Sequence, residues 1–229
     1  MRQIDWKASA RYQKPISREY QEERDQEIIF LLDCGRRMRA KDGELSHFDH
    51  ALNAMLVTSH VALRQGDAVG LLSFAGNERW FAPLKGRSNI ERLLHRVYDL
   101  HSSTATSDFL SAAQQLITRQ RKRALIVLMT AIRAEDSEDL QAALALLQRK
   151  HLVLVANLRE CELEQKMQQP ITTLNSALLY AGIAQAQNAQ QNLFARLRQQ
   201  RVNLIDALPQ HLHRELVNQY WQMKMSGVL

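Results

Sequence analysis

Residues 28–38 decide the fold of this chain, and they read IIFLLDCGRRM. The first five are apolar without a break, which is typical of a parallel strand covered on both faces, and Asp33 comes where that strand ends. In open α/β sheets, ligands bind at the carboxyl edge of the strands, near the point where the strand order reverses. The stretch therefore predicts a buried central strand that delivers one carboxylate to a binding edge.

Helical and strand-like patterns alternate along the rest of the chain. This alternation predicts βαβ units and a doubly wound, mostly parallel α/β sheet with helices on both faces. In it the strand 123–129, apolar after Arg123, flanks the first strand. The other expected strands are 67–74, 152–158 and 202–205, and the expected helices are 48–63, 107–120, 137–150, 172–200 and 209–225. The long helix 172–200 has an apolar side but no heptads, so we expect it to pack on the surface of the domain.

One antiparallel strand is expected at an edge of the sheet. Residues 79–83 follow the strand 67–74 after a gap too short for a crossover helix, and Pro83 suits an edge position because it has no N–H to donate. Beyond it, the Ser88-x-x-Glu91 pattern predicts a capping box that begins the next helix.

Length and composition indicate one domain. With 229 residues, 45% of them hydrophobic, the chain can bury one large core, which we place at residues 26–229. Residues 1–25 are polar, and Pro15 interrupts any helix, so an extended arm is expected there. Two cysteines without Cys-x-x-Cys spacing indicate a reducing compartment.

Two classes of function are disfavoured by composition. A net charge of +6 would permit binding to nucleic acid, but the cations are spread along helical patterns and aromatic residues make up only 6% of the chain. The apolar runs are far shorter than the roughly 20 residues that a membrane span requires. Neither a nucleic-acid partner nor a membrane span is expected.

Three short motifs carry a family resemblance. Residues 4–11 read IDWKASAR, residues 23–25 read ERD and residues 218–224 read NQYWQMK. Together they resemble the bacterial "domain of unknown function 58" (DUF58) family, whose fold is that of a von Willebrand factor A domain. The resemblance implies a protein partner, a MoxR-type AAA+ ATPase. It also implies a cytoplasmic protein, or one peripheral to the inner membrane where an anchor precedes the chain, as in many relatives.

The Asp-x-Gly-x-Arg sequence after the first strand resembles a worn metal-ion-dependent adhesion site. In A domains this site holds Mg²⁺ through Asp-x-Ser-x-Ser, a Thr from a neighbouring loop and an Asp after the fourth strand. Asp33 is retained here. Gly35 and Arg37 stand where the serines would be, and Ala131 replaces the later Asp. Because Mg²⁺ needs several oxygen ligands and Arg37 is cationic, we expect neither a metal nor another cofactor.

The threonine of the second loop is replaced by a serine. Ser107, with Asp108 beside it, takes this position, and Thr104 or Thr106 would take it under a small shift of the alignment. Asp108 has a second interpretation, as a first-turn acid that complements the dipole of the following helix.

The basic loop after the first strand can be interpreted in two ways. Arg37 is expected to reach back and neutralise Asp33, although backbone N–H groups could also satisfy that carboxylate. Arg36, Arg39 and Lys41 form either a solvated loop or a rim that docks an acidic patch on a partner, with Met38 as an adaptable apolar contact.

Catalysis finds little support in the sequence. Nucleophile-elbow, phosphate-loop and His-Glu-x-x-His motifs are missing, and the eight histidines are scattered. The sequence is therefore interpreted as a non-enzymatic protein-interaction module and partner of a MoxR-type ATPase. The alternative is a Mg²⁺-dependent adhesion or ligand-binding A domain, and a hydrolase is a weaker third.

Overall fold

A computed structural model describes residues 26–227 and Arg11 of the protein. Apart from Arg11, the expected arm 1–25 and the motifs at 4–11 and 23–25 lie outside the described residues. The strands are β1 (Glu27–Asp33), β2 (Lys41–Asp42), β3 (Leu45–Ser46), β4 (Ala68–Phe74), β5 (Arg79–Leu84), β6 (Leu125–Thr130), β7 (Leu152–Leu158) and β8 (Asn203–Ala207). The α-helices are α2 (His47–Arg64), α3 (Asn89–Val97), α4 (Phe109–Arg119), α5 (Ser137–Gln148), α6 (Cys161–Met167), α7 (Leu174–Gln199) and α8 (Leu212–Met225), and the 3₁₀ turns are η1 (Arg36–Arg39), η2 (Ala134–Asp136) and η3 (Pro209–His211).

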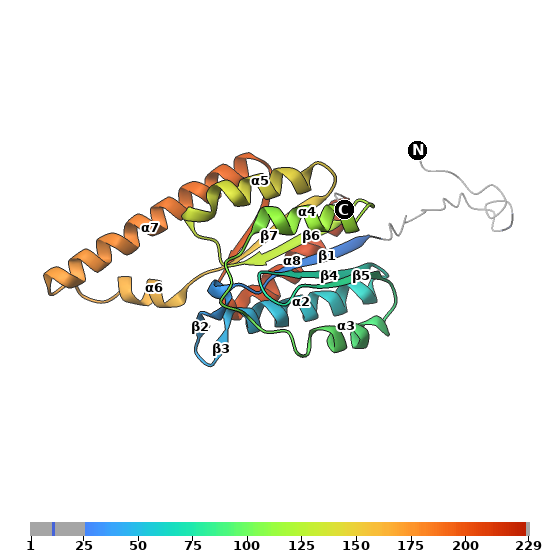
Figure 1. Cartoon of the computed structure of the whole chain (residues 1–229), viewed down its shortest axis with the longest axis horizontal. Coiled ribbons are helices and arrows are strands. Elements are labelled where there is room, and N and C mark those ends of the chain that lie inside the picture. The colour runs from blue at the N-terminus through green and yellow to red at the C-terminus, as the bar shows by residue number, and fades with distance from the viewer. Residues whose placement is uncertain (1–10, 12–25, 228–229) are drawn as a thin grey trace.

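The predicted sheet is confirmed. Within residues 26–227, six strands form one sheet in the order β5-β4-β1-β6-β7-β8, in which only β5 runs antiparallel to its neighbour (Figure 1). β1 lies between β4 and β6, with Leu32 opposite Met129 in the parallel register. The chain order on the two sides of β1 reverses here, so its carboxyl end lies at the switch point of the fold.

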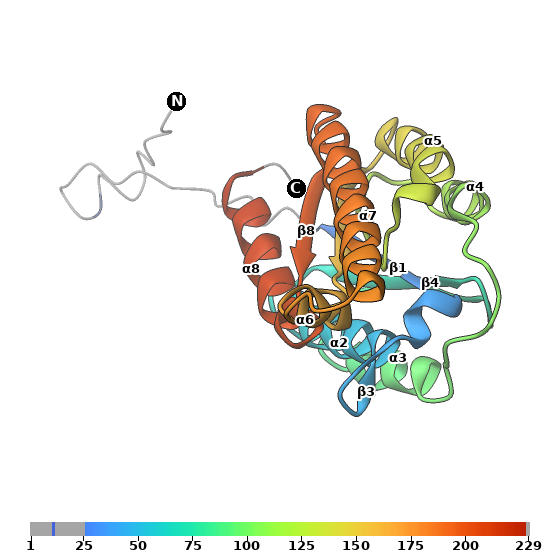
Figure 2. The ribbon, with the colours of Figure 1, turned by 90° about the vertical axis from the view of Figure 1, so that its left-hand side faces the viewer.

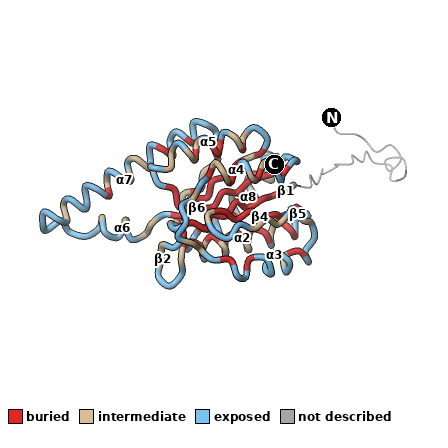
Figure 3. The backbone as a smooth tube through the Cα atoms, viewed as in Figure 1, coloured by how far each residue is buried: buried red, intermediate tan, exposed pale blue. Residues whose placement is uncertain are grey.

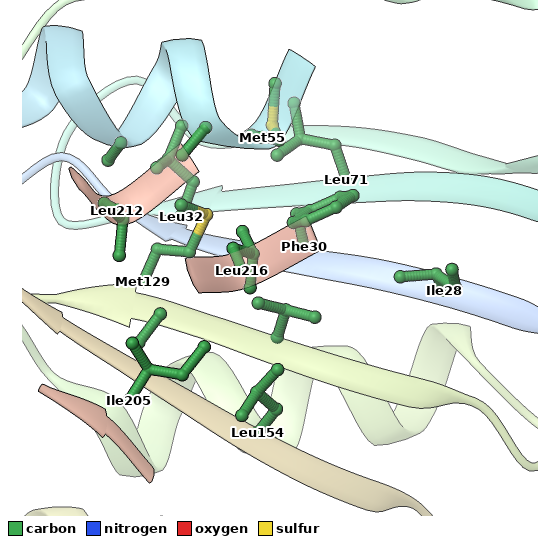
Figure 4. Close-up of a cluster of buried hydrophobic side chains, with 14 of the residues drawn as sticks. Ile28, Phe30, Leu32, Met55, Leu71, Met129, Leu154, Ile205, Leu212 and Leu216 are labelled. Carbon is green, nitrogen blue, oxygen red and sulfur yellow. The ribbon is translucent and has the colours of Figure 1, made fainter. Parts of the chain in front are cut away.

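Helices cover both faces of the sheet. Because successive strand residues point to opposite faces, Ile28, Phe30 and Leu32 pack under α2, α3 and α8, whereas Ile29 and Leu31 pack under α4, α5 and α7. Figure 2 shows the two helical layers from the side, and Figure 4 shows the core around Phe30. Burial on both faces explains why β1 is apolar without alternation.

A buried ionic network ties α8 to the amino end of β4. Asp67, 1% exposed, precedes β4 and accepts hydrogen bonds from Tyr220 Oη at 2.5 Å and from Lys224 Nζ at 2.8 and 2.9 Å. Burial and the neighbouring Asp67 carboxylate raise the pKa of Tyr220. Both partners belong to the NQYWQMK motif, which therefore holds the last helix onto the sheet.

One local expectation was wrong, and three local features were not predicted. The Ser88 side chain forms no cap; instead Asn89 donates its side-chain amide to the carbonyl of Lys85. A capping box does form one helix earlier, between Ser46 and Asp49 at the start of α2. The β2–β3 hairpin and α6 were not predicted, because each is too short to give a periodic pattern.

The long helix α7 packs along only part of its length. Leu193, Phe194 and Leu197 in its second half are buried against the sheet, as expected. Its first half extends beyond the sheet with α6 beside it, and most of that half is exposed in Figure 3. The prediction of a packed surface helix therefore holds for the second half, whereas in the first half only Ile183 is buried.

Candidate functional site

The centre of the candidate site is the Asp33 carboxylate at the carboxyl end of β1. It is 1% exposed and accepts the Gly35 N–H at 2.7 Å. Ser107 Oγ lies 2.8 and 2.9 Å from its two oxygens, and Thr130 Oγ1 donates to Oδ2 at 2.6 Å. Burial raises the pKa of Asp33, although the hydrogen bonds from Thr130, Gly35 and Ser107 oppose the rise. The carboxylate is thus satisfied by uncharged donors of its own chain.

Gly35 closes the space beside this carboxylate. A Cβ placed on Gly35 would collide with Ser107 Oγ and lie 3.0 Å from Asp33 Oδ1. The backbone of Gly35 has φ −74°, a value open to any residue, so lack of space and not conformation excludes a side chain. The hydroxyl of a serine ligand therefore has no room at position 35 in this arrangement.

Arg37 does not pair with Asp33, and that expectation is corrected. Its guanidinium binds Glu135 and Asp136 of η2, and its side chain is only 12% exposed. The reason is local: residues 36–39 form the turn η1, and from this turn the Arg37 side chain reaches the acidic residues of η2. Burial lowers the pKa of Arg37, and the nearby Glu135 opposes this.

The other cations of the loop form an exposed rim. Arg36, Arg39 and Lys41 all face solvent, as the docking interpretation requires. Met38 is fully buried, so its predicted role as an adaptable contact for a partner is wrong. We use "basic rim" below for Arg36, Arg39 and Lys41.

The second loop folds over β1 through Ser107. Its backbone is held to the first loop by the Arg36 N–H, which donates to the Ala105 carbonyl at 2.9 Å. Thr104 and Thr106 are exposed, and neither shows a hydrogen bond to Asp33. The serine assignment is the one that the geometry favours.

Asp108 turns away from Asp33 and caps α4. Its carboxylate accepts the Ser111 N–H at 2.8 Å, which agrees with its interpretation as a helix-terminal acid. Asp139 of α5 accepts the first two N–H groups of the helix, those of Phe109 and Leu110, at 2.8 and 3.2 Å. Asp139 was not singled out in the sequence, because it lies a whole βα unit away.

Two further polar residues at this edge were missed. Thr130 ends β6, and Asn157, fully buried near the end of β7, accepts the Ile132 N–H at 2.7 Å. Both are polar residues near the carboxyl end of an apolar parallel strand, as Asp33 is. The pairing of Leu32 with Met129 places Thr130 beside Asp33, so a register argument could have found it.

The residues present do not fit the Mg²⁺ ion that A domains hold. Among residues 26–227, Asp33 is the one carboxylate at the centre, and Gly35 leaves no room for a side-chain ligand at its own position. Ala131, which the resemblance aligns with the later Asp, is buried and offers no side-chain oxygen. Among the described residues, no group of three or more His, Cys, Asp or Glu side chains is placed to bind a metal. Ser107 and Thr130 already bond to Asp33, so its two carboxylate oxygens are occupied by hydroxyls of the same chain.

Comparison with known proteins settles the family. The model of the family described as "Protein of unknown function DUF58" matches residues 1–188. The chain belongs to the DUF58 family. A search among curated proteins found no similar sequence.

A solved structure shares the fold of this DUF58 chain. The conserved hypothetical protein BatB from Bacteroides thetaiotaomicron is similar with a TM-score of 0.52 and 15% identity, over 87% of this chain and 99% of that chain. A von Willebrand factor type A protein from Catenulispora acidiphila gives a TM-score of 0.49 and 13% identity, over 85% of this chain and 42% of that one. The sheet of this chain, with the order β5-β4-β1-β6-β7-β8 and one antiparallel edge strand, is von Willebrand A-like. Among the described residues, no helix has both the length and the apolarity needed to cross a bilayer.

Proposed function

We propose that this DUF58 domain is a non-enzymatic protein-interaction module whose partner is a MoxR-type AAA+ ATPase in the bacterial cytoplasm. Family membership supports an A-type domain, and A domains commonly act by binding other proteins. The carboxyl edge of the sheet, which is the usual binding edge of this architecture, is the surface that we assign to the partner.

The observation that carries the proposal is the combination of a closed centre and a charged border. Asp33 is satisfied internally by Gly35, Ser107 and Thr130, so a metal would have to displace these hydrogen bonds to reach the carboxylate. The basic rim stands exposed beside it on η1 and β2. A surface of this kind recognises an acidic patch by charge and needs neither a metal nor a reaction.

Charge reversal tests the proposal directly. Arg36, Arg39 and Lys41 are changed together to Glu, and association with a cognate MoxR-type ATPase is followed by surface plasmon resonance at several salt concentrations. Because rim charges steer encounters, we expect association at low salt to slow by about tenfold or more, with a flatter salt dependence.

A matched control uses the opposite edge of the sheet. Arg64, Arg121 and Arg149 are also exposed, and their reversal to Glu changes the net charge equally. Equal slowing by the two triple variants would mean that only net charge matters and would reject the assigned edge. Unchanged binding by the rim variant would place the interface elsewhere.

The Mg²⁺-dependent alternative keeps one supporting observation, the oxygen donors of Asp33, Ser107 and Thr130 in close contact. Thermal denaturation with added Mg²⁺, Mn²⁺ or EDTA separates the two functions. An ion that binds only the folded state must raise the melting temperature. We expect no shift, and a saturable rise with Mg²⁺ would favour the adhesion function.

A further inference from the structure

The first half of α7, together with the loop before it, is unlike the rest of the chain in charge. Residues 167–195 contain no Asp, Glu, Lys, Arg or His, although 24% of the whole sequence is charged. Charged residues are depleted at the centres of protein interfaces. The uncharged stretch begins at Met167, the last residue of α6, and ends where α7 packs onto the sheet.

Large apolar side chains are exposed in this same stretch. Leu174 is 76% exposed, Leu178 63% and Leu179 52%, and Ile171 before the helix is 52% exposed. Leu174, Leu178 and Gly182 are four residues apart, so they form one ridge along α7. Figure 3 shows that this part of the helix stands clear of the body of the molecule.

A cleft of about 730 Å³ lies beside the ridge, between α6, α7 and the ends of β6 and β7. Its lining includes Leu163 of α6 and Leu178, Gly182 and Ile183 of α7. The charged residues around it have partners: Arg133 binds Glu160 at 2.7 Å, Arg159 binds Asp206 at 3.0 Å, and Glu135 binds Arg37. The cleft is suited to an uncharged, apolar side chain.

We propose that the occupant is the α7 helix of a second copy of this chain. The net charge of +6 makes two copies repel each other, and the uncharged stretch is the surface on which they can meet without that repulsion. Homodimer interfaces are also more apolar than interfaces between transient partners. A foreign partner would find no charge here by which to be selected.

The two-fold symmetry of a homodimer fixes which residues meet. When two α7 helices cross antiparallel with Leu178 at the axis, Leu174 of each copy lies beside Gly182 of the other. A Cβ built on Gly182 has no atom within 4 Å, so there is open space to receive the leucine. The neighbouring cleft then takes up the exposed start of the partner helix.

The test is the oligomeric state of the whole chain, measured by sedimentation equilibrium up to about 0.1 mM protein. We expect the natural chain to form dimers, and Leu174→Glu with Leu178→Glu to weaken the dimer by about 100-fold or more, because each leucine buries its side chain in the contact. The matched control is Leu94→Glu with Tyr98→Glu on α3, where Leu94 is 45% and Tyr98 77% exposed. The control should dimerise as the natural chain does.

Each other outcome overturns the proposal. A natural chain that stays monomeric at the highest concentration has no such dimer, whether or not another protein occupies the cleft. A dimer that survives both leucine changes uses another surface. If the double variant fails to fold, salt decides: the natural dimer should hold or tighten between about 50 and 500 mM NaCl, and a tenfold loss would show a charged interface instead.

Discussion

Two buried aspartates lie at opposite ends of the paired strands β1 and β4, and they are satisfied in different ways. Asp67, at the amino end, has the ammonium of Lys224 and the phenol of Tyr220. Asp33, at the carboxyl end, has two hydroxyls and one backbone N–H but no ion pair with any described cation. Each is 1% exposed, so burial alone does not explain the difference.

The two arrangements differ in what they hold together. A buried carboxylate with a cation fixes one helix in place and is costly to break. Asp33 instead draws together the end of β1, the second loop through Ser107 and the end of β6 through Thr130. Because only hydrogen bonds hold it, its protonation state stays open to change, and burial raises its pKa.

Lys224→Met gives the largest expected effect. The change leaves the Asp67 carboxylate buried without its cation, and we expect the free energy of unfolding to fall by about 3 kcal/mol. Urea denaturation followed by circular dichroism measures it. Lys166→Met, at an exposed lysine of α6, is the control and should change stability by less than about 0.5 kcal/mol. Equal effects of the two variants would show that the ion pair between Lys224 and Asp67 contributes no special stability.

Asp33→Ala and Asp33→Asn come next and test how much the hydrogen bonds to Asp33 stabilise the fold. Alanine leaves the Gly35 N–H and two hydroxyls without their acceptor, at an expected cost of about 2 kcal/mol. Asparagine keeps an oxygen for Gly35 and Ser107 and can donate its amide to Thr130 Oγ1, so we expect a loss below about 1 kcal/mol. Urea denaturation at pH 7 compares them. A larger loss for Asn than for Ala would mean that the negative charge itself is required.

The pH dependence of stability tests whether the folded chain favours Asp33 in its protonated or its charged form. The folded-state pKa of Asp33 is raised above 3.8, so the folded state holds its proton over a range in which the unfolded state has lost it. Relative to Asp33→Asn, the natural chain should therefore lose stability as the pH rises above 3.8, by at most about 1.4 kcal/mol per pH unit. Unfolding curves of both proteins from acid to neutral pH measure this. A relative gain with rising pH would show a carboxylate stabilised in its charged form.

The sheet was predictable from the sequence and the centre of the site only partly. Continuous apolar runs such as 28–32 report burial on both faces, and the order of helices and strands then leaves few topologies. Asp33 and Ser107 follow from the end of a strand and from the resemblance. Thr130 and the partners of Arg37 depend on register and on the direction of a 3₁₀ turn, which residue spacing does not report. Residues 134–136 are nearly a hundred positions away from Arg37.

Arg37→Met is expected to affect Asp33 the least and asks whether Asp33 depends on a cation after all. The guanidinium binds Glu135, which is 64% exposed, and Asp136, which is 15% exposed, so its removal frees η2 more than it exposes the core. We expect a loss of about 1 kcal/mol in the free energy of unfolding by urea, since part of this ion pair lies in solvent. Arg37 is the weakest of the influences on the pKa of Asp33, so the pH dependence measured against Asp33→Asn should scarcely change. Arg36→Met, at the exposed neighbour, is the control. If Arg37→Met instead lowered the free energy of unfolding as much as Lys224→Met and enlarged the pH dependence, Asp33 would depend on a cation as Asp67 does. The two aspartates would then not differ in kind.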